Sequence, residues 1–141
     1  MVPSGASADP SGGGPRHQAR ERAFGLLYEA EVKHLDPAQL LDSLGVPPDP
    51  YTERLVRGVA RLQERVDSLL AEAAVGWELG RMPAVDRAVL HVAVFELLEE
   101  PDVPVAVVID EAVELVKQFS TDDSGRFVNG VLATVAAKTR T

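Results

Sequence analysis

Side chains that could bind a metal or carry out catalysis are few and scattered. The three histidines lie on separate segments, cysteine is absent, and no H-E-x-x-H spacing occurs. Gly125 and Gly130 have the spacing of a phosphate loop, but Val131 and Leu132 stand where that loop requires Lys and Ser or Thr. The adjacent acidic pairs are typical of helix caps and solvated faces. We therefore expect no enzymatic activity, no metal and no cofactor.

Basic side chains gather at the start of the first predicted helix. Arg16 and Arg20 are one helical turn apart, and His17 and Arg22 lie close by. The free amides and partial positive charge of a helix N-terminus favour phosphate, whereas basic side chains there oppose the helix dipole. Two explanations therefore stay open from the residues alone: a site for an anionic ligand, or an ordinary solvated helix end.

A second basic group lies further along the chain, where four arginines occupy an arc of about 80° on one predicted helix. Glu53 precedes Arg57 by four residues, and Glu64 and Glu72 lie on or near the same arc. Local ion pairing is therefore favoured over a ligand site. The four residues are Arg54, Arg57, Arg61 and Arg65.

Apolar residues recur at spacings of three and four, which predicts helices and not strands. We expect a helix to begin at Pro37, with Asp36 as its N-cap, and Gly130 to mark a close helix crossing. The prolines between Gly45 and Pro50 make that segment a connector. The other predicted helices run from Pro15 to about His34, from Leu55 to Ala73, from about Ala84 to Leu98 as a central helix, from Val105 to Phe119, and onward from about Phe127. The turn before this last helix offers Asp122, Asp123 and Ser124 as capping candidates.

The composition indicates one folded all-α domain of about six or seven helices. The chain has 141 residues, of which 45% are hydrophobic, enough for a single core. Its net charge of −8 excludes a protein that coats nucleic acid by charge alone, so any RNA site must be local. We expect residues 1–14, rich in Gly, Ser and Pro, to be a disordered tail. We also expect a cytoplasmic protein without a membrane span.

Several segments carry a specific resemblance. The chain resembles the bacterial NusB family from about Arg16 to Ala137, with the matching motifs in the same order. The clearest of them are Ala19–Tyr28, Val85–Leu90, Ile109–Leu115 and Phe127–Leu132.

The resemblance implies a non-enzymatic transcription factor built from two packed helical subdomains. These would divide residues 15–141 into an N-terminal half, about 15–75, and a C-terminal half, about 76–141. Such a protein joins the ribosomal protein NusE and binds boxA RNA within the transcription elongation complex, during antitermination and ribosomal RNA synthesis. A related helical domain precedes the catalytic domain of some RNA cytosine methyltransferases, but we expect no methyl transfer by this chain.

The resemblance also assigns candidate site residues. The RNA-binding residues it implies are Arg16, Arg20, Arg22, Asp122, Asp123 and Phe127. The NusE-facing residues it implies are Tyr28, Asp86 and His91. Because His17 and Gln18 interrupt the arginine run of the family, we expect weaker RNA binding or greater dependence on a partner.

A function of a different class stays open beside this one. The chain could be a helical scaffold for protein binding, such as a homodimer, in which the arginines of the first helix only aid solubility. Phe127 likewise has two interpretations, a residue of the core or an exposed platform for an RNA base.

Overall fold

A computed structural model describes residues 14–76 and 81–140, so most of the predicted tail lies outside the described residues. Within these ranges the chain forms seven helices and no strand, which confirms the all-α prediction. None of these helices is both long and apolar enough to cross a membrane. The helices are α2 (Pro15–Val32), α3 (Pro37–Ser43), α4 (Pro50–Arg61), α5 (Gln63–Ala73), α6 (Ala84–Glu99), α7 (Val105–Phe119) and α8 (Asp122–Thr139).

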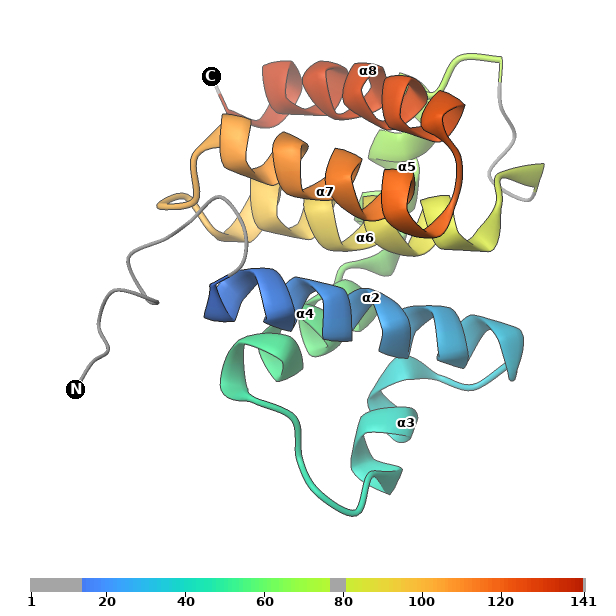
Figure 1. The fold of residues 1–141 in the computed structure, drawn as a ribbon, viewed down its shortest axis with the longest axis vertical. Coiled ribbons are helices and arrows are strands. Elements are labelled where there is room, and N and C mark those ends of the chain that lie inside the picture. Colours follow the sequence, from blue (N-terminus) through green and yellow to red (C-terminus); the bar gives the residue numbers. More distant parts are fainter. Residues whose placement is uncertain (1–13, 77–80, 141) are drawn as a thin grey trace.

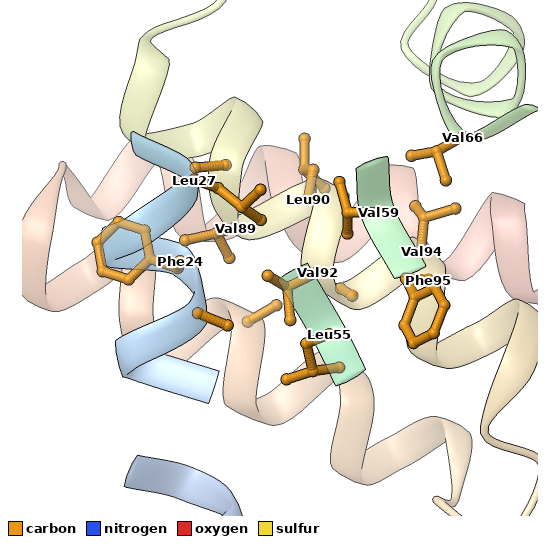
Figure 2. Close-up of a cluster of buried hydrophobic side chains, with 14 of the residues drawn as sticks. Phe24, Leu27, Leu55, Val59, Val66, Val89, Leu90, Val92, Val94 and Phe95 are labelled. Atoms are coloured by element: carbon orange, nitrogen blue, oxygen red, sulfur yellow. The ribbon is translucent and has the colours of Figure 1, made fainter. Parts of the chain in front are cut away.

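Helix α6 is the centre of the fold, as its nearly continuous apolar sequence predicts. It contacts α2, α4, α5, α7 and α8, and every residue from Ala88 to Leu97 is buried. In Figure 1 it runs between α7 and α8 on one side and α2 with α4 on the other. Side chains from α2, α4, α5 and α6 meet in the core shown in Figure 2.

The apolar stripe from Leu55 to Ala73 forms two helices and not the single long helix expected. The chain turns at Leu62, and this redirects α5 away from the line of α4. Helix α4 contacts α2 and α3, whereas α5 contacts α8. A straight helix of that length could not follow both surfaces, so the core it covers bends it. The division into halves near residue 75 stays a prediction.

The predicted helix crossing at Gly130 is wrong. A Cβ atom added at Gly130 would meet nothing within 4 Å, because this glycine lies on the exposed side of α8. The close crossing occurs instead at Gly58 of α4, where an added Cβ would lie 2.1 Å from Cε1 of Phe95. The absence of a side chain at Gly58 lets the Phe95 ring of α6 pack directly on the backbone of α4.

Helix ends are set partly by caps that the sequence revealed. Asp36 accepts a hydrogen bond from the amide of Gln39 at 3.3 Å, which confirms the predicted start of α3. At α8 the cap is Thr121 and not Asp122, Asp123 or Ser124: its Oγ1 accepts from the amide of Ser124 at 3.0 Å. At the far end of α6, the Arg140 guanidinium donates to the carbonyls of Glu96, Leu97, Glu100 and Val103.

Candidate RNA-binding surface at the start of α2

Helix α2 carries the first group of predicted RNA-binding residues. Gly14 is its N-cap and Pro15 its first helical residue, a position that suits proline because the missing amide has no helical partner there. Ala19, Ala23 and Leu27 lie on the buried side of the helix, against α4 and α6. This packing fixes which basic side chains face outward.

Arg20 faces inward, which corrects the expectation that it is available to RNA. Its side chain is 2% exposed. Its Nε donates to both carboxylate oxygens of Glu96, at 2.9 and 3.0 Å, and its Nη1 donates to Oε1 of Glu111 at 3.0 Å. Position 20 falls within the buried arc of α2, and the two glutamates from α6 and α7 supply the countercharge that a buried guanidinium needs. A phosphate therefore has no access to Arg20 here.

The carboxylates of Glu111 and Glu96 also contact two neighbouring side chains, those of His17 and Tyr51. Oε1 of Glu111 lies 3.0 Å from Nδ1 of His17, and the Tyr51 hydroxyl donates to Oε2 of Glu96 at 2.5 Å. Burial lowers the pKa of Arg20, but the charge and hydrogen bonds of Glu96 outweigh this and the net shift is upward. Burial, with the charge of Glu96 beside it, raises the pKa of Tyr51, so this hydroxyl stays a donor. We call Arg20, Glu96, Glu111, His17 and Tyr51 the buried ionic network.

Arg16 lies at the N-terminal end of α2 and is exposed. The carbon at the centre of its guanidinium lies 4.5 Å from the centroid of the Tyr51 ring, a cation–π contact. Arg16 has no carboxylate partner among the described residues. Its charge is therefore available to an anion.

Arg22 is also exposed but lies on the flank of α2 that faces the start of α4. It lines a shallow pocket with Pro15, Gln18, Pro48 and Asp49. No ion pair joins Arg22 to another residue in the ranges 14–76 and 81–140. Arg16 and Arg22 are thus two uncompensated cations near one helix end.

The second group of predicted RNA-binding residues lies in the first turns of α8. Asp122 and Asp123 are exposed, and Asp123 pairs with Arg126. Phe127 is partly buried and packs against the core, so it is not a fully exposed platform.

The turn between α7 and α8 lies beside the middle of α2. The rings of Phe119 and Phe24 are 5.3 Å apart. Phe24 follows Arg16 by eight residues, about 12 Å along the helix. The first predicted group therefore lies at the start of α2, and the second, on α8, lies beside the middle of α2. The two groups do not form one compact cluster.

The α4–α5 arginines differ from Arg16 and Arg22 because three of them are ion-paired. Arg57 contacts Glu53 and Asp42, Arg54 contacts Glu100, and Arg61 contacts Glu99. This confirms the ion pairing predicted for the group, although Glu72 pairs instead with Lys138. Arg65 makes no ion pair with any described residue.

Comparison with known proteins gives this arrangement a family. The chain matches the NusB family over residues 17–137. It is 55% identical, over 129 residues, to the transcription antitermination protein NusB of Saccharopolyspora erythraea, a match covering 87% of each protein. The chain belongs to the NusB family.

Solved structures of NusB proteins share the fold. The chain is similar to T. maritima NusB, with a TM-score of 0.81 and 34% identity over 90% of this chain and 94% of the other. It is also similar to a chain in a crystal structure of the antitermination factors NusB and NusE with double-stranded RNA, with a TM-score of 0.74 and 28% identity over 87% of this chain and 96% of that one.

The residues that the NusB resemblance assigned to a partner surface differ in access. Tyr28 is 40% exposed on α2. His91 is largely buried on α6 and its Nε2 lies 2.8 Å from Oδ1 of Asp67, at the edge of a pocket lined also by Leu27 and Leu35.

Asp86 is not on an accessible surface, contrary to its assignment to the partner surface. It is 2% exposed, and its Oδ2 accepts a hydrogen bond of 2.7 Å from the Ser124 hydroxyl. This contact joins the first turn of α6 to the first turn of α8, so Asp86 acts within the fold. Its other oxygen, Oδ1, has no hydrogen-bond partner among the described residues.

Sequence reasoning missed the residues that surround Arg20 and Arg16. Glu96 lies between Phe95 and Leu97 in the most buried helix, so a charged residue inside that apolar run was a usable signal for a buried ion pair. Tyr51 carried no such signal, because its contact with Arg16 depends on the packing of α2 against α4.

Proposed function

We propose that this protein is an antitermination factor that binds boxA-type single-stranded RNA together with the ribosomal protein NusE and supports ribosomal RNA transcription. It acts in the cytoplasm, in the transcription elongation complex, by binding and not by catalysis. Membership of the NusB family supports the proposal. So does the similar NusB structure, in which NusB is in complex with NusE and double-stranded RNA.

The observation that carries the RNA part is that two arginines without ion-pair partners among the described residues lie near one helix end of an acidic protein. Most arginines of the described chain contact carboxylates or carbonyls, but Arg16 and Arg22 do not. Unlike Arg65, which also has no ion pair with a described residue, these two lie near the N-terminus of α2. Phosphate is the ligand that suits guanidinium groups beside free helix amides. Of the three arginines that the resemblance implied, we therefore assign phosphate binding to Arg16 and Arg22 and not to Arg20.

The length of α2 suits an extended strand. RNA bound at Arg16 would run along α2 towards the α7–α8 turn, where Asp122, Asp123 and Phe127 lie about two helical turns away. Carboxylates repel phosphates, so we expect Asp122 and Asp123 to accept hydrogen bonds from base edges. Phe127 is half-buried, so only part of its side chain is accessible to a base.

The proposed NusE surface lies around Tyr28 at the other end of α2. Tyr28, Val32 and Leu35 are between 40% and 56% exposed, which is unusual for large apolar side chains so close together along a chain. Of these residues, Leu35 lines the same pocket as His91. The same apolar residues also suit the alternative, a scaffold or homodimer without RNA.

Measuring RNA affinity with and without NusE separates the two functions. A basic partner would offset the charge of −8 and extend the RNA surface, so we expect the pair to bind boxA-type RNA more tightly than this chain alone. A scrambled RNA of equal length is the control. Equal affinities at one salt concentration would contradict the cooperative part of the proposal. If the chain binds no RNA either with or without NusE, the alternative function, a protein-binding scaffold, would be favoured.

A further inference from the structure

Tyr51 is held rigidly between the surface and the core. Pro50 begins α4 just before it, and the Asp49 carboxylate caps that helix by accepting from the Thr52 amide at 3.1 Å. The Tyr51 hydroxyl then reaches Glu96 on the central helix at 2.5 Å. The ring is therefore fixed both by its own backbone and by a buried carboxylate.

The same carboxylate fixes the helix that carries Arg16. Glu96 accepts from Nε of Arg20, one turn after Arg16 on α2. Tyr51 and Arg20 thus share one acceptor, and this sets the position of the Tyr51 ring relative to the start of α2. The ring lies under the Arg16 guanidinium at 4.5 Å.

A support of this kind matters at a helix end. Arg16 is the second residue of α2 and has a long side chain that would otherwise sample many rotamers. Stacking covers one face of the guanidinium with the ring and leaves the opposite face and the N–H edge uncovered by it. A side chain already ordered loses less entropy when it binds.

We propose that Tyr51 is the positioning residue of the RNA site: its ring orients the Arg16 guanidinium, so that the outward N–H groups meet an RNA phosphate. This inference rests on the proposed function, because it requires RNA to bind at Arg16. The role of the Tyr51 hydroxyl is to hold the ring through Glu96, and the ring itself supports Arg16. The two roles are separable by substitution.

A double-mutant cycle tests the proposal. The affinity of boxA-type RNA for the chain with NusE is measured over a range of salt for the wild type, Arg16→Ala, Tyr51→Leu and the double variant. Tyr51→Leu should weaken binding roughly two- to five-fold, the size of an exposed cation–π contact. In the Arg16→Ala background it should cause no further loss, since the supported group is gone. Arg16→Ala should lower the salt slope by about 0.7, as one lost phosphate contact does.

Conservative variants separate positioning from folding. Tyr51→Phe keeps the ring under Arg16 and loses the bond to Glu96, so it should lower the melting temperature and weaken RNA binding clearly less than Tyr51→Leu does. Tyr51→Met, in both backgrounds, gives the same cycle if Tyr51→Leu does not fold. Arg65→Ala removes one exposed arginine that has no ion pair with a described residue, and it should change RNA affinity little.

The outcomes distinguish this inference from the function it depends on. If Tyr51→Leu weakens binding equally with Arg16 and with Ala at position 16, or if Tyr51→Phe weakens it as much as Tyr51→Leu, Tyr51 does not act through Arg16 and the inference is wrong while RNA binding stands. If the wild-type protein with NusE binds no boxA-type RNA, both are wrong.

Discussion

A single turn of α2 separates Arg16 from Arg20, yet the two side chains have opposite environments. Arg16 stacks on Tyr51 at the surface, and Arg20 is buried between Glu96 and Glu111. The sequence predicts that the two residues share a side of the helix, but the countercharges lie 76 and 91 residues further along the chain. Only the packing of α6 and α7 on α2 brings them together.

Arg20→Ala should destabilise the fold and not remove a phosphate contact. The substitution leaves two buried carboxylates without their main countercharge, a change that typically costs about 3–5 kcal/mol. Urea unfolding measures the loss in the free energy of unfolding. Below the unfolding transition, the salt slope of RNA binding should match the wild type. A normal free energy of unfolding together with a slope reduced by about 0.7 would show that Arg20 binds phosphate after all.

At the scale of helices, the close crossing predicted at Gly130 lies instead at Gly58, a residue for which the sequence analysis predicted no role. Gly58 provides the close crossing of α4 and α6, whereas Gly130 lies exposed on α8. A glycine inside a helical pattern signals a crossing only when its side of the helix faces a neighbour, and at Gly58 that neighbour is the buried Phe95 ring. Residue spacing alone does not identify this neighbour.

Gly58→Ala and Gly130→Ala form a matched pair. The first places a Cβ against the Phe95 ring, which the surrounding core holds, and should cost about 1–3 kcal/mol. The second adds a good helix former in open space and should stabilise the protein by up to about 1 kcal/mol. Thermal unfolding of both variants checks the opposite signs. Equal shifts in melting temperature would contradict this account of the crossing.

Thr121→Ala tests the observed start of α8. Its hydroxyl oxygen accepts from the Ser124 amide, so its loss should cost about 1 kcal/mol, as for other N-caps. Asp122→Ala and Asp123→Ala should each cost less, because these residues contribute only through the helix dipole and exposed contacts. Chemical unfolding of the three variants ranks them. A larger loss for Asp122→Ala or Asp123→Ala would mean that the cap is assigned to the wrong residue.

For the molecule as a whole, helix periodicity was enough to predict the all-α fold and the central place of α6. The same evidence could not show the bend at Leu62, because the apolar stripe continues through it and only the surfaces under α4 and α5 differ. The accessibility of the candidate site residues could likewise be predicted only in part. Exposure of Arg16 and Arg22 agrees with their predicted role, while Arg20 and Asp86 are buried by contacts distant in sequence. A basic or acidic residue therefore reveals its charge in the sequence but not its access to solvent.

The salt dependence of RNA binding decides whether the start of α2 is the phosphate-binding surface. Replacing Arg16 and Arg22 together by alanine should weaken binding of boxA-type RNA and lower the slope of log affinity against log salt by about 1.4, since each single-strand phosphate contact contributes about 0.7. The matched control replaces Arg57 and Arg61 by alanine. This removes the same amount of charge, but from arginines that are paired with carboxylates of the protein. We predict an almost unchanged slope for that control. Equal losses of affinity and slope in the two double variants would show a general effect of charge and contradict an RNA site at Arg16 and Arg22.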